Sequence, residues 1–224
     1  MKKIIFAVLT VLAVLAAVSA CIEFVKLLSG FKINTSAKFA QNNELLFVLG
    51  FAVYLAVHIL LYRPVFMHVM AHELTHALWA MFFGGKTKKL EVSRTGGRVL
   101  INKSNFLISL APYFFPLYTV LFSAIYIIAA DKFRPLIAFF VGASLSFHVA
   151  LTLYSLTVNQ SDLKEDSNVV FSAAFIIFMN TLVIGAVLAM IADNISFMPF
   201  FMESIKGTLG IVKWIFVTLN EALK

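Results

Sequence analysis

The sequence is poor in cysteine, proline and charged residues, and each shortage excludes a class of protein. One cysteine in 224 residues excludes a disulfide framework and any zinc or iron–sulfur site built from several cysteines. Five prolines beside 24 phenylalanines exclude a disordered, collagen-like or low-complexity chain. Charged residues make up 13% of the chain, whereas about 25% is usual in soluble proteins.

Apolar side chains are what the sequence has in abundance. Hydrophobic residues make up 61% of the chain, and a soluble domain of this size cannot bury so large an apolar fraction. The composition therefore predicts an integral, multi-pass membrane protein whose residues 1–224 form one membrane domain. In such a protein the net charge of +7 is expected to reflect cytoplasmic loops and contact with anionic lipid, not nucleic-acid binding.

Apolar runs long enough to cross a bilayer, about 20 residues each, recur along the chain. We expect an all-α fold with about six transmembrane helices, at residues 4–27, 45–62, 65–83, 105–130, 135–157 and 168–192. The long run from 45 to 83 is read as two helices, because Arg63-Pro64 removes a backbone donor and disfavours helix before it. Residues 1–44 would form the first helix and a polar connector, and residues 45–192 the core.

The two ends of the chain each allow two interpretations. Residues 18–21 read Val-Ser-Ala-Cys and resemble the lipobox of bacterial lipoprotein signal peptides. The apolar run continues past Cys21, however, which favours an uncleaved first helix. At the other end, polar residues of 197–224 recur at helical spacing, which predicts an amphipathic helix along the membrane surface; a seventh span is the alternative.

A different pattern separates the third expected helix from the fourth. Within residues 86–103, apolar and polar residues alternate on both sides of Gly96-Gly97, which predicts a small membrane-associated β-hairpin. Its six Lys and Arg residues are typical of a solvated basic loop. The alternative is an edge strand that pairs with an extended substrate segment. Pro112 and Pro116 are expected to loosen the helix that follows, either to form a cleft or as a packing kink.

Residues 72–76 read His-Glu-Leu-Thr-His, the HExxH pattern, inside an apolar run. Residues i and i+4 share a helix face about 6 Å apart, so His72 and His76 can reach one metal ion. Glu73 lies beside that face, where it can act as a general base. The alternative is a pair of packing histidines neutralised by Glu73, which does not explain why they lie in hydrocarbon. Imidazole and carboxylate ligands favour zinc, although the ligand types also admit cobalt or iron.

HExxH in an apolar helix, then Gly-Gly, a basic hairpin and further spans, resembles the site-2 protease family of intramembrane zinc metalloproteases. The likeness runs from about Val65 to Phe171. In that family a third ligand, an Asp within Leu-Asp-Gly, comes from a later span. Here residues 160–163 read Gln-Ser-Asp-Leu, similar to the Gln-x-Asp of a compact bacterial branch, so the resemblance implies Asp162 as that ligand. Thr75 stands where the family often has Gly.

Topology gives a check on Asp162 that does not use the resemblance. Two expected spans lie between the hairpin and residue 158, so Asp162 emerges on the side of the membrane where His76 lies. Asn159, Gln160 and Ser161 suit unwound backbone that lines a wet cavity. The charge balance of the loops does not decide the orientation; we expect a cytoplasmic hairpin, as in the family.

Four further residues are candidates for supporting the metal ligands or binding substrate. His148 is expected at the depth of His76, so it is an alternative third ligand, a supporting residue or a hydrogen-bonded core histidine. His68 lies about 12 Å along the axis from His76, too far to share its metal, and is read with Gln160 as a supporting residue. Asn180 would bind substrate backbone or another helix. His58 is expected to be a packing residue.

The resemblance implies hydrolysis of peptide bonds in or near transmembrane segments of single-pass membrane proteins, in a bacterial cell membrane. His72, His76 and Asp162 would hold one Zn²⁺ per chain, and Glu73 would take a proton from water and return it to the leaving amine. The competing hypothesis is a catalytically silent metal-binding scaffold or transporter. The presence of Glu73 argues against it, because a structural metal site does not need an adjacent base.

Overall fold

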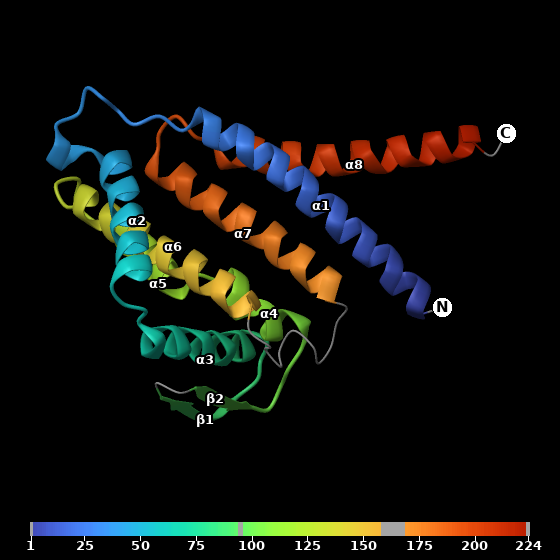
Figure 1. The fold of residues 1–224 in the computed structure, drawn as a ribbon, viewed down its shortest axis with the longest axis horizontal. Coiled ribbons are helices and arrows are strands. Elements are labelled where there is room, and N and C mark those ends of the chain that lie inside the picture. Colours follow the sequence, from blue (N-terminus) through green and yellow to red (C-terminus); the bar gives the residue numbers. More distant parts are fainter. Residues whose placement is uncertain (1, 94–95, 158–168, 223–224) are drawn as a thin grey trace. The chain divides into compact units, whose positions relative to one another are not determined.

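The computed structural model describes residues 2–93, 96–157 and 169–222, and within these ranges the chain is largely helical (Figure 1). Its α-helices are α1 (Lys2–Gly30), α2 (Asn43–Leu60), α3 (Val65–Phe82), α4 (Phe106–Phe114), α5 (Leu117–Ile128), α6 (Arg134–Thr157), α7 (Val169–Ile191) and α8 (Phe197–Ala222). A short 3-10 helix spans Phe39–Gln41, and strands β1 (Thr87–Val92) and β2 (Gly97–Ile101) form one antiparallel sheet. The predicted helical fold with one small hairpin is confirmed.

Four of these helices, α1, α2, α6 and α7, are long and apolar enough to cross a membrane. The bent pair α4–α5 makes a fifth if it counts as one span. Of the six expected spans, α3 is the one that is not apolar enough to count as a candidate span. Its 18 residues include three histidines and a glutamate. Its bounds match the prediction, and its place within the bilayer stays a prediction. The exposed apolar side chains along α1, such as Ile4 at 70%, suit contact with lipid.

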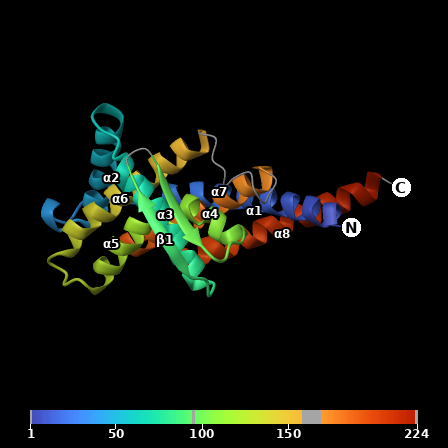
Figure 2. The same cartoon turned by 90° about the horizontal axis from the view of Figure 1, so that it is seen from below.

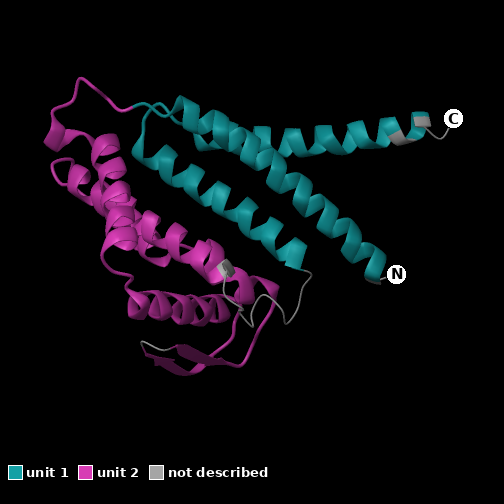
Figure 3. Cartoon of the chain, in the orientation of Figure 1, with its two compact units in different colours: residues 1–32, 167–224 teal, residues 33–166 magenta. Residues whose placement is uncertain are grey.

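The chain divides into two compact units, residues 1–32 with 167–224 and residues 33–166 (Figure 3). Each is described by itself below, and the expected single membrane domain stays a prediction. The first unit contains α1, α7 and α8. Helix α1 packs against both of the others, and Ser19 Oγ donates a hydrogen bond to the Ser204 carbonyl of α8 at 2.8 Å.

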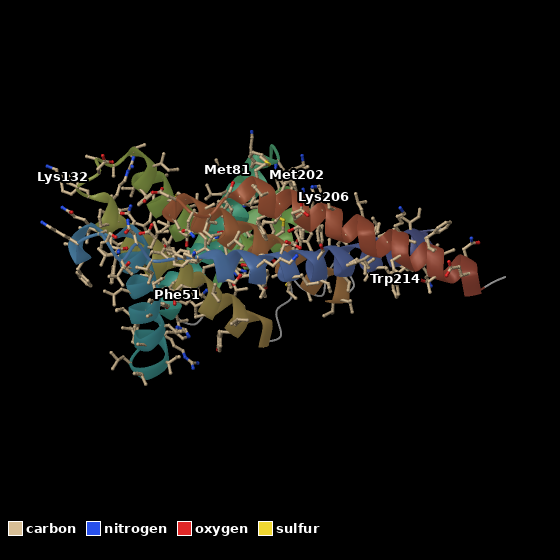
Figure 4. The ribbon with its side chains drawn as sticks, turned by 90° about the horizontal axis from the view of Figure 1, so that it is seen from above. Phe51, Met81, Lys132, Met202, Lys206 and Trp214 are labelled. Carbon is tan, nitrogen blue, oxygen red and sulfur yellow. The ribbon has the colours of Figure 1, made fainter. Side chains whose placement is uncertain are left out.

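The C-terminal segment forms the single long helix that its periodicity predicts. Met202, Lys206 and Trp214 are exposed along α8 (Figure 4). Helix α8 is not among the helices apolar enough to span a membrane within the described residues. Its position at a membrane surface stays a prediction. At the other end, Cys21 is exposed within the continuous helix α1, and both interpretations of residues 18–21 stay open.

Close backbone contact joins α2 and α6 in the second unit. A Cβ atom on Gly50 would lie 1.9 Å from the Phe139 carbonyl oxygen, and one on Gly142 would lie 2.0 Å from the Phe47 carbonyl oxygen. Side chains at either glycine would therefore push the two helices apart. Small residues that let backbones approach are typical of helix pairs in membranes.

The chain turns sharply at each end of α3. Pro64 precedes its first residue, as the break expected at Arg63-Pro64 requires. At the other end, Gly84 adopts φ +75°, its N–H donates to the Met81 carbonyl at 2.9 Å, and the Gly85 N–H donates to the Ala80 carbonyl at 2.7 Å. This paired arrangement is a Schellman motif, which favours glycine because of its left-handed residue.

The reversal after α3 lays the hairpin along that helix (Figure 1 and Figure 2). Within the hairpin, Val92 pairs with Gly97 and Leu90 with Val99. At the open end of the hairpin, the Asn102 Oδ1 accepts a hydrogen bond from the Lys86 N–H at 2.6 Å. The hairpin predicted for residues 86–103 is confirmed, but its turn does not lie at Gly96-Gly97, because Gly97 already pairs with Val92 as the first residue of β2. Strand β2 begins beside α3.

A break follows the hairpin where two prolines were expected to loosen the helix. Helix α4 contains Pro112, Pro116 immediately precedes α5, and the two helices meet at a bend of 68°. The predicted interruption is confirmed. Asn105 caps the start of α4, since its Oδ1 accepts a hydrogen bond from the Ile108 N–H at 2.9 Å.

Candidate metal centre

Helix α3 brings His72 and His76 together on one face. Their Nε2 atoms are 3.2 Å apart, and their rings meet nearly at right angles, with centroids 4.8 Å apart. His76 is buried, with 8% of its surface exposed. The expectation that residues i and i+4 converge is confirmed for this pair.

Helix α4 contacts both imidazoles and fixes how they are presented. The His76 Nδ1–H donates a hydrogen bond to the Ile108 carbonyl at 2.8 Å. Because a neutral imidazole carries one proton, that bond leaves a lone pair on His76 Nε2, which faces His72. The Tyr113 ring packs edge-on against His72, with centroids 5.6 Å apart. A backbone carbonyl that binds the outer nitrogen is a common support for a metal-binding histidine.

The spacing of the two nitrogens is that of a hydrogen bond between the two imidazoles, and it is also close to the spacing of two zinc ligands. Zn–N bonds of about 2.0–2.1 Å in tetrahedral geometry place two ligand nitrogens about 3.3 Å apart, and the observed separation is 3.2 Å. In the described part of the chain, no group of three or more His, Cys, Asp or Glu residues gathers around one point. Asp162, the third ligand that the resemblance implies, and Gln160 both lie outside the described residues.

Glu73 lies against the hairpin, one position further around α3 than His72. A Cβ atom on Gly97 would be 2.6 Å from Glu73 Cγ, 3.0 Å from Glu73 Oε1 and 2.6 Å from Val69 Cγ1. The first residue of β2 therefore leaves room for the glutamate because it has no side chain. Sequence reasoning found the glutamate but not this contact, since nothing local links residues 73 and 97.

A cavity of about 30 Å³, with both polar and apolar lining, adjoins His72. Side chains of α3, α5 and α6 contribute its polar lining: His68, His72, Thr75, Tyr118, Ser144, His148 and Thr152. His68 Nε2 is hydrogen-bonded to Ser155 Oγ of α6 at 3.1 Å. The structure thus brings His68 and His148 to one cavity beside His72, while their roles as supporting residues stay predictions.

Sequence reasoning missed the polar stripe of α6 that faces this cavity. Ser144, His148, Thr152 and Ser155 recur at intervals of four, four and three residues, and all four are buried. That spacing places them on one helix face. The sequence alone therefore indicates this stripe, of which only His148 is among the predicted site residues.

Asn180, the remaining candidate, and His58, the expected packing residue, lie on helices other than α3 and α6. Asn180 belongs to α7 in the first unit, and its Nδ2 donates a hydrogen bond to the Ile176 carbonyl of the same helix at 2.9 Å. Its contact with a substrate stays a prediction. His58 lies on α2, with its Nδ1 3.4 Å from the Tyr54 hydroxyl, as suits a packing residue.

A scan against models of protein families, a search of curated proteins and a search of solved structures found no match to this chain. The resemblance to the site-2 protease family therefore rests on the residues themselves and on their spacing.

Proposed function

We propose that the chain is an intramembrane zinc metalloprotease of a bacterial cell membrane, which cleaves single-pass membrane proteins in or near their transmembrane segments. The observation that supports this most is the pair of facing Nε2 atoms on His72 and His76, 3.2 Å apart, with the outer nitrogen of His76 bound to a carbonyl. At 3.2 Å the His72 Nε2–H donates a hydrogen bond to the His76 Nε2 lone pair. The proposal is therefore supported by the convergence of the two Nε2 atoms together with the carbonyl that orients the outer nitrogen of His76.

Each residue has a stated role in the proposed reaction. His72, His76 and Asp162 hold the zinc, which when bound supplies a Lewis acid for peptide hydrolysis. Glu73 accepts a proton from the attacking water and donates it to the leaving amine. Gly97 leaves the space in which the Glu73 side chain lies. The Ile108 carbonyl and the Tyr113 ring hold the two imidazoles in place.

In the proposed function, substrate binds at an edge of the hairpin. A helical substrate hides its carbonyls in i to i−4 hydrogen bonds, so it must unwind before a peptide bond can be cleaved. A two-stranded sheet has an outer edge on each strand, and extended segments bind to such edges through backbone hydrogen bonds. Because β2 begins beside Glu73, a segment paired with the hairpin passes close to the proposed base.

Metal analysis of the purified full-length protein tests the proposal. We expect one zinc per chain, and less than about a tenth of that in His76→Ala, because two remaining ligands bind zinc weakly. His58→Ala is the matched control and should keep the metal. Wild-type protein should also cleave a co-expressed single-pass membrane protein. Zinc binding without cleavage of any such protein would instead support a metal-binding scaffold or transporter.

The contact between Gly97 and Glu73 gives a second test. Gly97→Val is expected to lower the cleavage rate about 10²-fold by displacing the glutamate, an effect of the size that an ångström of misplacement produces. Zinc content should not change. Valine favours strands, so loss of the hairpin does not explain the defect. Arg98→Gln, on the opposite face of β2, should cleave normally. Wild-type rates in Gly97→Val would show that Glu73 does not need this space.

A further inference from the structure

The carbonyl that binds His76 lacks its usual helical partner. In an α-helix the carbonyl of residue i accepts a hydrogen bond from the N–H of residue i+4. Ile108 and Pro112 stand in that relation within α4, and proline has no N–H. The Ile108 carbonyl instead accepts the Nδ1–H of His76 at 2.8 Å.

The missing N–H of Pro112 and the hydrogen bond from His76 to the Ile108 carbonyl explain each other. Ile108 is 1% exposed, so water is not at hand to satisfy its carbonyl, and an unsatisfied buried carbonyl is costly. A proline ring also pushes against the carbonyl four residues before it and tilts that carbonyl away from the helix axis. Pro112 therefore leaves the Ile108 oxygen without its helical donor, and the His76 Nδ1–H supplies a hydrogen bond to it instead.

We infer that Pro112 is a positioning residue of the metal site, which acts on His76 through the Ile108 carbonyl. This inference rests on the proposed zinc site of His72 and His76. A neutral imidazole with its proton on Nδ1 presents a lone pair on Nε2, whereas the other tautomer has a proton where the metal must bind. By keeping one acceptor available, Pro112 holds His76 in the tautomer that binds metal.

Pro112→Ala restores an N–H that competes with His76 for the Ile108 oxygen. Loss of such a supporting hydrogen bond typically lowers metal affinity about 10- to 100-fold, and we expect at least a tenfold weaker zinc affinity. Competition with a chelating dye on the full-length protein in detergent measures it. Pro135→Ala is the matched control, because Pro135 lies in the first turn of α6, where a helix needs no backbone donor. Equal zinc affinity in Pro112→Ala and wild type would overturn the inference.

An ester separates the missing N–H from the packing of the proline ring. Lactic acid incorporated at position 112 gives the alanine side chain without an N–H, and it should restore zinc affinity to within about threefold of wild type. If the ester binds zinc as weakly as Pro112→Ala, the ring is what matters and the inference is wrong. The ester also decides the matter if Pro112→Ala fails to fold.

The tautomer of His76 can be observed without metal. With ¹⁵N-labelled histidine, only five residues contribute signals, and His76→Ala assigns the one of interest. We expect His76 to be protonated on Nδ1 in the metal-free wild type and to shift toward the Nε2 tautomer in Pro112→Ala. An unchanged tautomer would overturn the inference. If the wild type binds no zinc, the proposed function fails, while this measurement still tests the link from Pro112 to His76.

Discussion

Replacing Glu73 with glutamine is expected to leave zinc bound and to lower the rate of peptide cleavage by about 10²- to 10⁴-fold, the usual contribution of a general acid–base group. Glutamine has nearly the shape of glutamate, so it fits the space beside Gly97. It cannot accept a proton from water. The measurement is a single-turnover cleavage rate on a purified membrane substrate, together with zinc content.

Glu203→Gln on α8 is the matched control for this prediction. Glu203 is exposed and pairs with Lys206 at 2.7 Å, so the same chemical change there should affect neither cleavage nor metal. Cleavage at the wild-type rate in Glu73→Gln would exclude Glu73 as the base and with it the proposed mechanism. Loss of zinc in that variant would mean that Glu73 holds the metal instead.

Gly142→Leu is expected to prevent the second unit from folding. A Cβ atom at position 142 would lie 2.0 Å from the Phe47 carbonyl oxygen and 3.0 Å from the Phe51 amide nitrogen. Both atoms are backbone, so neither can rotate away. Overpacking of a tight contact costs about 1–3 kcal/mol when side chains can adjust, and here we expect at least about 3 kcal/mol. The yield of monodisperse protein in detergent and its thermal unfolding midpoint measure the effect.

Two comparison variants isolate the helix contact. Gly142→Ala adds only the Cβ atom and should lie between wild type and Gly142→Leu. Gly210→Leu makes the same change in α8, where no heavy atom lies within 4 Å of an added Cβ. It should fold normally, because leucine also favours helix over glycine. A stable Gly142→Leu protein would show that α2 and α6 do not need this close approach.

Much of the fold could be predicted because its signals are local. Pro64 lacks a backbone N–H and restricts the residue before it, which ends the helix at that point. The alternation on either side of the two glycines indicates a hairpin, although Gly97 pairs with Val92 and so belongs to the strand instead of the turn. The observed α3 and β2 follow these signals. The convergence of His72 and His76 was predictable for the same reason, since helical periodicity fixes the positions of residues four apart.

What sequence reasoning did not find depends on contacts between distant segments. The link from His76 to Ile108 joins residues 32 apart, and Gly97 meets Glu73 only because the chain reverses after α3. The number of spans was harder to predict for a different reason. The histidines and glutamate that make α3 the candidate site also lower its apolar character.

Under the proposed function, the cavity beside His72 would have to provide the water that hydrolysis consumes. Each peptide bond cleaved consumes one water molecule, and a cavity of about 30 Å³ has room for about two. Each turnover would therefore consume a large share of the water that this cavity can hold. The hydroxyls of Ser144 and Thr152 and the imidazole of His148 line this cavity, and they are the groups that would hold such water by hydrogen bonds.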